Sequence, residues 1–552
     1  ELLFNSTDRT HEYRLRDVVH VIEHAATNDR IKVIALDLDG FLGGGQVALE
    51  RVGAALDKAR KAGKPVIAYA TGYADDSYVL AAHASEVWMD PMGAALIAGP
   101  GGSRPYFKGL VDRLGINVHV YRVGKFKSFV EPFVRADQSP EARQASQALA
   151  DALFDAWQTN VKAARPKARI AQFAANPPIA APGTSLASLA VRYGLVDKLG
   201  DRLVWSDRIA KLAGRDAGSP ADSFRGTDYS DYLAAHPVPD GHGIGVITVA
   251  GDIVDGEALA GTAGGDTISR LVLDAVAQKN LKALVVRIDS PGGSALAAEK
   301  IRQALLQARK QGLPIIVSMG NVAASGGYWI AMAGDTVFAE PSTITGSIGV
   351  FGLLPTFETS LSKIGVTADG VATTPLSGQP DLLRGTNETT DRLLQNGVDD
   401  IYLKFTSLVA TQRKMPRARV NEIAQGRVWD GGSARQIGLV DRFGTLEDAV
   451  AEAAKRAGLD PKSARPVYID RIPNWFELYA RNLQDVEART ALPVDPYSRM
   501  IMRQQASFAT GVADGLRIVT GPAVQVRCLA CPATPRYQNR ATALQLLRNK
   551  VF

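Results

Sequence analysis

The stretch Leu281-Lys282-Ala283-Leu284-Val285-Val286-Arg287-Ile288-Asp289 decides the fold, because it reads as a buried β-strand that leads into a helix. The strand, Ala283 to Ile288, ends at the turn Ser290-Pro291-Gly292-Gly293-Ser294, and a helical stretch runs from Ala295 to Gln311. A second strand is expected from Pro314 to Ser318. Strands that alternate with helices in this order predict an α/β fold with parallel sheets and covering helices.

The same pattern occurs earlier in the chain. Ile31 to Asp39 aligns with Leu281 to Asp289, and identical residues then recur at one constant spacing, namely Tyr78/Tyr328, Val87/Val337, Pro91/Pro341, Gly99/Gly349, Pro105/Pro355, Phe107/Phe357 and Gly115/Gly365. A later pair of matching segments is Gly194-Leu195-Val196-Asp197 and Gly438-Leu439-Val440-Asp441. We therefore predict two tandem βαβ domains that are related by internal duplication.

The repeat and the local composition suggest domain boundaries. We assign residues 1–218 to an N-terminal repeat domain, 219–242 to a linker rich in Asp, Pro and Gly, 243–465 to a C-terminal repeat domain, and 466–552 to an extension of unknown role, expected to be partly disordered. The second copy opens with a strand, Gly243 to Gly251, whose counterpart falls upstream of Glu1 in this alignment. We therefore expect the chain to be part of a longer protein.

Composition agrees with two globular domains. The 552 residues are too many for one hydrophobic core, and 46% hydrophobic with 22% charged residues is ordinary for a globular chain. The net charge of +6 is mild, and the basic residues are scattered without interleaved aromatic residues. Nucleic acid is therefore not an expected partner. No stretch reaches the roughly 18 to 20 apolar residues that span a bilayer.

The two cysteines, Cys528 and Cys531, lie close together in the extension. The alternatives are reduced surface thiols and a short-range disulfide. Because no second cysteine pair or nearby histidine completes a set of four ligands, we expect no metal site and assign the pair no catalytic role.

Ser325 is the candidate nucleophile, in the turn Val322-Ala323-Ala324-Ser325-Gly326-Gly327-Tyr328-Trp329. A serine between a strand and a helix is exposed there, and the amides at the helix start can stabilise an oxyanion. The alternative is a serine kept for close packing or as a helix N-cap. The turn Ser290 to Ser294 could bring further amides to a carbonyl oxygen, or it could serve only as a tight connection.

A serine nucleophile needs a base, and histidine is the usual one. The histidines are absent from the core of the serine-bearing copy, since they lie at His11, His20, His24, His83, His119, His236 and His242. A lysine is the natural substitute, provided that burial lowers its pKa from about 10.4 so that the amine is neutral.

From about residue 1 to 460 the chain resembles the long, two-domain form of the signal peptide peptidase A family. The resemblance is carried by Arg122-Val123-Gly124-Lys125-Phe126-Lys127-Ser128-Phe129-Val130-Glu131-Pro132-Phe133, by the turns around Gly292 and Ser325, and by Thr345-Gly346-Ser347-Ile348-Gly349. It implies a crotonase-like and Clp-protease-like fold. It also implies that Ser325 is the nucleophile, Lys127 the general base, and Ser347 a hydroxyl that orients the lysine. The oxyanion donors would be the backbone amides of Gly292, Gly293 and Gly326, and no metal or cofactor is required.

The resemblance further implies a membrane-associated serine endopeptidase that degrades cleaved signal peptides and other unfolded apolar peptides. It would be held at the bacterial inner membrane by an upstream segment, with both domains facing the periplasm, and would assemble as a homo-oligomer, expected to be a tetramer. The repeat agrees with a divided site, because Asp75 aligns with Ser325 and Ala372 to Ser377, opposite Lys127, contains no lysine. Two alternatives remain, a crotonase-like acyl-CoA enzyme and a non-catalytic envelope scaffold.

Overall fold

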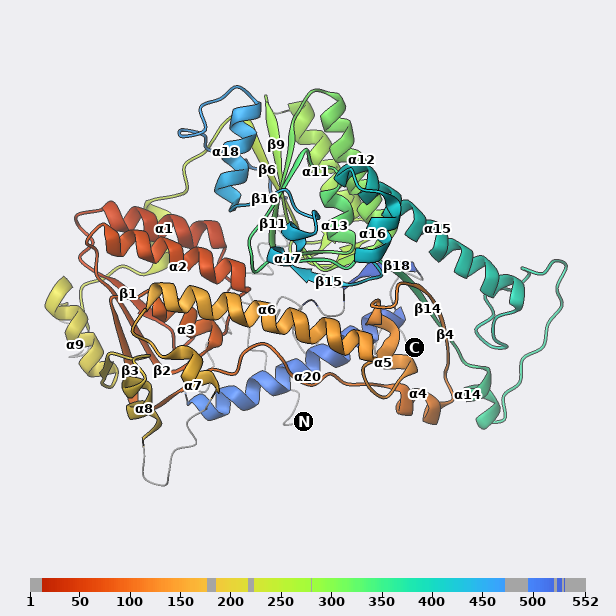
Figure 1. The fold of residues 1–552 in the computed structure, drawn as a ribbon, viewed down its shortest axis with the longest axis horizontal. Coiled ribbons are helices and arrows are strands. Elements are labelled where there is room, and N and C mark those ends of the chain that lie inside the picture. The colour runs from red at the N-terminus through yellow and green to blue at the C-terminus, as the bar shows by residue number, and fades with distance from the viewer. Residues whose placement is uncertain are drawn as a thin grey trace.

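The computed structural model describes residues 12–175, 185–216, 223–278, 280–471, 495–520, 524–528 and 531. Within them, two α/β units lie next to each other, and a long two-stranded arm and helix α20 (Pro496–Thr520) lie to one side and below (Figure 1). None of the described helices is long and apolar enough to cross a membrane.

The first unit is built on a parallel sheet of order β1-β2-β3-β5. Its strands are β1 (Ile34–Asp37), β2 (Val66–Ala74), β3 (Glu86–Leu96) and β5 (Lys198–Leu199). Nearly every residue of β2 is buried, as expected for a central parallel strand covered on both faces. The accompanying helices are α1 (Leu15–Thr27), α2 (Gln46–Lys61), α3 (Asp75–Ala82), α6 (Pro140–Ala164), α7 (Ile170–Ala175), α8 (Leu186–Arg192), α9 (Arg202–Ala213) and α10 (Tyr229–Ala235).

The second unit has a larger sheet of order β15-β13-β11-β9-β6-β17, with β12 branching from β11 and β16 pairing with β12. The strands are β6 (Ile244–Ala250), β9 (Ala283–Ser290), β11 (Ile315–Ala324), β12 (Thr336–Ala339), β13 (Ile344–Gly346), β15 (Val428–Asp430), β16 (Arg442–Phe443) and β17 (Val467–Tyr468). The helices are α11 (Gly265–Gln278), α12 (Ala295–Lys310), α13 (Gly326–Ala331), α15 (Glu388–Arg413), α16 (Arg417–Ile423), α17 (Gly431–Gln436) and α18 (Leu446–Arg456). The strand and helix expected from Ala283 to Gln311 are thus present.

Equivalent contacts in the two units confirm the predicted duplication. The strand order β1-β2-β3-β5 corresponds to β9-β11-β12-β16. The hydroxyl of Tyr78 donates to the Leu195 carbonyl at 3.0 Å, and the hydroxyl of Tyr328 donates to the Leu439 carbonyl at 2.8 Å. Both tyrosines are fully buried. The same aromatic side chain therefore closes the same connection in each copy.

A third sheet combines strands from both units and from the C-terminal extension. Its order is β4-β14-β18-β10-β7-β8. The strands are β4 (Asn117–Val123), β14 (Val350–Thr356), β18 (Val524–Arg527), β10 (Gly292–Ser294), β7 (Ile253–Val254) and β8 (Ala263–Gly264). Short helices flank β4 and β14, namely α4 (Lys108–Leu114), η1 (Ser128–Val130), α5 (Glu131–Val134) and α14 (Glu358–Lys363). The extension, for which the sequence predicted no role, therefore contributes a central strand to this sheet.

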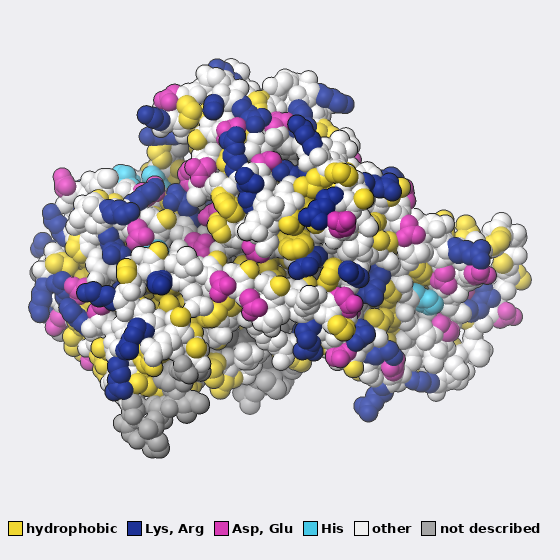
Figure 2. All heavy atoms as spheres, in the orientation of Figure 1, with side chains coloured by type: hydrophobic (Ala, Val, Ile, Leu, Met, Phe, Trp, Pro, Cys, Tyr) yellow, Lys and Arg dark blue, Asp and Glu magenta, His cyan; other side chains and the backbone are white. Residues whose placement is uncertain are grey.

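Helix α2 docks the first unit onto the second. Gln46 Nε2 donates to Ser342 Oγ at 3.1 Å, and the Ala48 amide donates to Asn321 Oδ1 at 3.1 Å. Arg51 forms an ion pair with Glu447 at 2.8 Å. On the face seen in Figure 2, basic and acidic side chains are interspersed. The contacts of helix α2 with the second unit fix how the two units are placed around the third sheet.

Candidate active site

Ser325 lies between the end of β11 and the start of α13, as the sequence predicts. Its backbone has φ 55° and ψ −111°, a conformation that costs of order 1–3 kcal/mol for a residue other than glycine and is common at functional sites. The sequence predicted an exposed serine, but the side chain is fully buried because Lys127 and Gly292 pack against it, and it forms no N-cap hydrogen bond. The structure therefore does not support the N-cap alternative.

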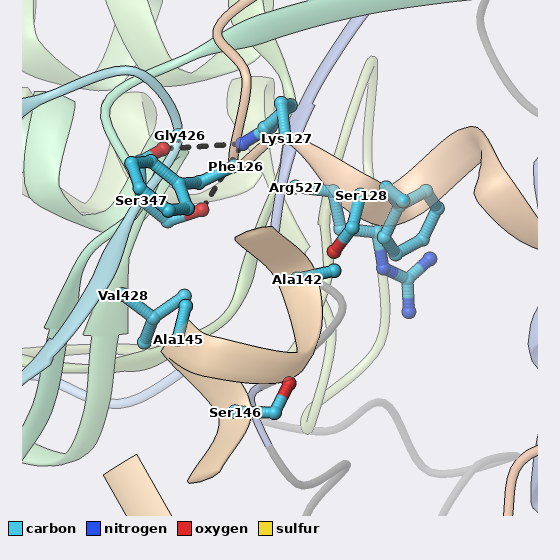
Figure 3. Close-up of a pocket in the computed structure, with 11 residues that line it drawn as sticks. Phe126, Lys127, Ser128, Ala142, Ala145, Ser146, Ser347, Gly426, Val428 and Arg527 are labelled. Atoms are coloured by element: carbon cyan, nitrogen blue, oxygen red, sulfur yellow. Dashed lines mark hydrogen bonds between the residues drawn. The ribbon is translucent and has the colours of Figure 1, made fainter. Parts of the chain in front are cut away.

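Lys127 lies in the loop between β4 and η1 and reaches the serine from the other copy of the repeat. Its Nζ lies 2.8 Å from Ser325 Oγ, 3.1 Å from Ser347 Oγ and 3.1 Å from the Ser347 carbonyl oxygen. Figure 3 shows the two contacts between Lys127 and Ser347. The lysine is 2% exposed. The structure thus brings together the three side chains that the sequence singled out.

Burial sets the electrostatics of this lysine. Burial holds the pKa of the Lys127 amine well below its usual range, because an ammonium loses its hydration in a closed site. The three nearest polar groups are two hydroxyls and a carbonyl, all neutral. Among the described residues no carboxylate forms an ion pair with Lys127, so desolvation favours the neutral amine.

Ser347 owes its position to an unusual backbone. It has φ 52° and follows Gly346, which has φ 79°. Its amide donates to the Arg427 carbonyl at 2.7 Å, so that both its hydroxyl and its own carbonyl are turned toward Lys127.

Of the three glycines predicted to supply oxyanion donors, Gly292 and Gly326 lie next to Ser325, whereas Gly293 packs against Ile253. A Cβ atom on Gly292 would lie 2.8 Å from Gly326 N and 3.1 Å from Ser325 Cβ, so only glycine fits this approach. Gly293 is also packed too tightly for a side chain, with the Ile253 carbonyl oxygen 2.0 Å from the Cβ position. The amide of Gly292 donates to Ser290 Oγ at 3.2 Å. Its predicted role therefore requires that this contact be exchanged for one to substrate.

The pocket beside Lys127 is assembled from three parts of the chain. Figure 3 shows residues of the first copy, of the second copy and Arg527 of the extension around it. The lining residues are Phe126, Lys127, Ser128, Phe129, Ala142, Ala145, Ser146, Ser347, Gly426, Val428 and Arg527. Sequence reasoning missed Gly426 and Arg527. A positive φ of 77° explains the glycine, but no local pattern connects Arg527 with a lysine 400 positions earlier.

Cys528 and Cys531 form a disulfide, which decides between the two alternatives left by the sequence. Both are buried against Val322, Ala324 and neighbouring apolar residues, so they are not surface thiols. Among the described residues, no group of three or more His, Cys, Asp or Glu side chains is arranged to hold a metal ion.

A buried serine at a strand-to-helix turn, within hydrogen-bonding distance of a basic side chain, defines a serine hydrolase on a duplicated α/β fold. Comparison with known families narrows this class. The family described as Peptidase family S49 matches residues 58–215 and 307–460, one segment in each copy. The chain therefore belongs to peptidase family S49 and is a serine-type protease.

Similar proteins agree with this membership. Protease 4 of Salmonella typhi is 39% identical over 461 residues, which cover 83% of this chain and 74% of that protein. Protease 4 of Haemophilus influenzae is 39% identical over 447 residues, covering 79% and 72%. The chloroplastic serine protease SPPA of Arabidopsis thaliana is 28% identical over 454 residues, covering 79% and 64%.

Proposed function

We propose that the chain is a Ser/Lys endopeptidase in which Ser325 is the nucleophile and Lys127 the general base. The observation that carries the proposal is the 2.8 Å contact between Lys127 Nζ and Ser325 Oγ. Membership of a peptidase family argues against the acyl-CoA enzyme and the scaffold considered above.

The geometry around Lys127 supports a base rather than a structural cation. The Ser347 carbonyl oxygen can only accept a hydrogen bond, and the Ser347 hydroxyl can accept a second one. A neutral amine that donates its two N–H groups to these oxygens directs its lone pair at the third neighbour, the Ser325 hydroxyl. Ser347 is thus a positioning residue that orients the lone pair of the base.

The proposed reaction follows from this arrangement. Lys127 accepts the proton of Ser325, and Oγ attacks the peptide carbonyl carbon to form a tetrahedral intermediate. Backbone amides of Gly326 and of the Gly292-Gly293 turn stabilise the oxyanion. The Lys127 ammonium gives its proton to the leaving amine, and an acyl-enzyme remains on Ser325. Water, deprotonated by Lys127, then hydrolyses this ester.

We infer that the substrates are cleaved signal peptides and other unfolded apolar peptides. Phe126, Phe129, Ala142 and Val428 give the pocket an apolar lining, and a buried site admits only a chain that can extend into it. Membrane attachment through an upstream segment, a periplasmic location and assembly into a tetramer belong to the same proposal. Fractionation and native mass measurement of the full-length protein test them, and a cytosolic monomer would contradict all three.

Labelling with a fluorophosphonate tests the chemistry directly. Intact-mass measurement should show one adduct per chain, lost in Ser325→Ala and strongly reduced in Lys127→Ala. The matched control is Lys125→Ala, because Lys125 lies two residues from the base but is exposed. Full labelling of Ser325→Ala would overturn the assignment of the nucleophile.

A further inference from the structure

Strand β18 fills a gap between two strands that border the active site. It is antiparallel to β10, where Val526 pairs with Gly293, and antiparallel to β14, where Gln525 pairs with Phe351. Without β18, both neighbours would present unpaired backbone groups to a space one strand wide. Such a space accepts an extended peptide by adding it to the sheet.

The path of β18 runs directly past the candidate nucleophile. The position that a Cβ on Gly292 would take lies 2.1 Å from the Val526 carbonyl oxygen, 2.8 Å from Gly326 N and 3.1 Å from Ser325 Cβ. A Cβ on Gly326 would lie 3.3 Å from Val526 Cγ2. The carbonyl of Val526 therefore stands next to the turn where a substrate must place its scissile carbonyl.

The side chains of β18 are held by apolar packing and by an ion pair, as those of a bound peptide would be. Val526 is fully buried in a cluster with Tyr121, Ala295 and Val350. Arg527 donates to both carboxylate oxygens of Asp252, at 2.9 and 3.0 Å. The free volume beside Lys127 is only about 10 Å³, close to the space of one water molecule. A peptide cannot enter while β18 is in place.

We propose that Val524–Arg527 is a substrate-like strand that occupies the peptide-binding slot between β10 and β14 and must leave before a substrate binds. The inference rests on the proposed function, because it concerns regulation of the same site. A tethered competitor lowers the apparent affinity for substrate in proportion to the fraction of molecules whose slot is open. The strand also indicates what the slot prefers, namely an apolar residue at the position of Val526 followed by a basic residue opposite Asp252.

The first test detaches the strand in the full-length protein. Val526→Pro removes a backbone N–H from the ladder, and we expect the KM for a fluorogenic apolar peptide to fall about tenfold or more with kcat retained. Val526→Ala keeps the N–H and should lower KM less. The free peptide Val-Gln-Val-Arg should inhibit Val526→Pro competitively. A folded Val526→Pro protein with unchanged KM, or with kcat lost, would overturn the proposal, because β18 would then be a fixed wall of the site.

A second variant keeps the test decisive if proline prevents folding. Arg527→Glu leaves the backbone intact but places a carboxylate opposite Asp252, so it should also lower KM. The preference of the slot is tested with two peptides that differ only in Arg or Gln after the apolar residue. The Arg peptide should be favoured by wild type at least several-fold, and Asp252→Asn should remove the difference. Equal rates in wild type would refute the assigned preference.

Binding measured without turnover separates this proposal from the proposed function. Fluorescence anisotropy with labelled Val-Gln-Val-Arg on full-length Ser325→Ala/Val526→Pro requires no chemistry. Saturable binding there, with no peptidase activity in Val526→Pro, would refute the Ser/Lys mechanism and support the occupied slot. Turnover by wild type without any binding or competition by this peptide would refute the occupied slot alone.

Discussion

The two copies of the repeat place different side chains at the same strand-to-helix turn. In the first copy, β2 leads into α3 at Asp75, whose carboxylate accepts hydrogen bonds from the amides of Ala98 at 3.1 Å and Gly99 at 2.8 Å. The next residue, Asp76, accepts from the Gly44 amide at 3.0 Å. In the first copy, therefore, the carboxylates at this turn bind backbone amides of two neighbouring loops.

In the second copy the aligned residues are Ser325 and Gly326, and within the described part of the chain no carboxylate forms a hydrogen bond with either residue. The residue aligned with Gly99 is Gly349, and its Cβ position lies 3.1 Å from Lys127 Cδ. Lys127 thus lies beside Gly349 in the second copy, at the position that corresponds to the Asp75 carboxylate beside Gly99 in the first copy. The turn at Asp75, whose carboxylate is taken up by backbone amides, has a structural role. The turn at Ser325, which combines a hydroxyl, a glycine and a buried amine, is suited to chemistry.

The largest expected effect is on turnover. Ser325→Ala and Lys127→Ala should each lower kcat by about 10⁴-fold or more, because members of one catalytic unit do not act independently. The mirror-image change, Asp75→Ser with Asp76→Gly, should create no second site, since Lys127, the proposed base, lies at the turn of the second copy. Peptide hydrolysis, with circular dichroism as a check on folding, measures both. Appreciable activity in either single variant would remove the asymmetry between the copies.

The pH dependence tests whether the lysine works as a neutral base. Burial lowers the pKa of Lys127, so activity should rise with pH through one apparent pKa below 10.5 and be lost as pH falls beneath it. The slope on the acid side should be about tenfold per pH unit. A profile governed by a group near pH 6.5 and abolished by a histidine substitution would contradict this assignment.

A stability measurement gives the cost of burying the amine. The folded state releases the Lys127 proton at a lower pH than the unfolded state, so stability rises with pH between the two pKa values. Lys127→Met should therefore raise the free energy of unfolding at neutral pH, by about 1.4 kcal/mol for each unit of pKa lowering. The gain should shrink toward pH 10. Denaturant titration at two pH values measures it, and a destabilised Lys127→Met at pH 7 would show that packing outweighs desolvation.

The smallest effect is expected on stability, at the Asp75 turn of the first copy. Asp75→Ala removes the acceptor of two backbone amides and should cost about 1–3 kcal/mol of stability, with peptidase activity retained. Asp75→Asn keeps one acceptor oxygen and should cost less. Thermal unfolding compares the two, and a loss of kcat in Asp75→Ala would mean that the first turn also serves the reaction.

The sequence alone was sufficient to predict the duplicated α/β fold and the turn of Ser325, because both depend on local patterns. Tyr78 and Tyr328 mark the repeat, and Gly326-Gly327 follows the end of a buried strand. Lys127 and Ser347 were selected only through the family resemblance. The contacts of Lys127 with Ser325 and Ser347 depend on how β4 and β14 pair, which no local pattern encodes.

The C-terminal residues show the limit most clearly. Val524 and Val526 alternate with polar residues, but four residues are too few to distinguish a strand from a loop. The predicted linker also contains a helix, α10, whose N-cap Asp228 accepts from the Asp231 amide at 2.9 Å. That capping signal was present in the sequence but was masked by the Pro, Gly and Asp content around it.

The distance along the chain between the proposed base and the proposed nucleophile has a consequence for when activity can arise. Lys127 and Ser325 are 198 positions apart and meet only when both units have folded and docked. During synthesis the lysine emerges first, and on the proposed mechanism no peptidase activity arises until the second unit is complete, so the growing chain would not digest itself or its neighbours. A single cut that lets the two units separate also leaves one fragment with a base and another with a nucleophile. On the proposed mechanism neither fragment holds both groups, so neither is expected to cleave peptides.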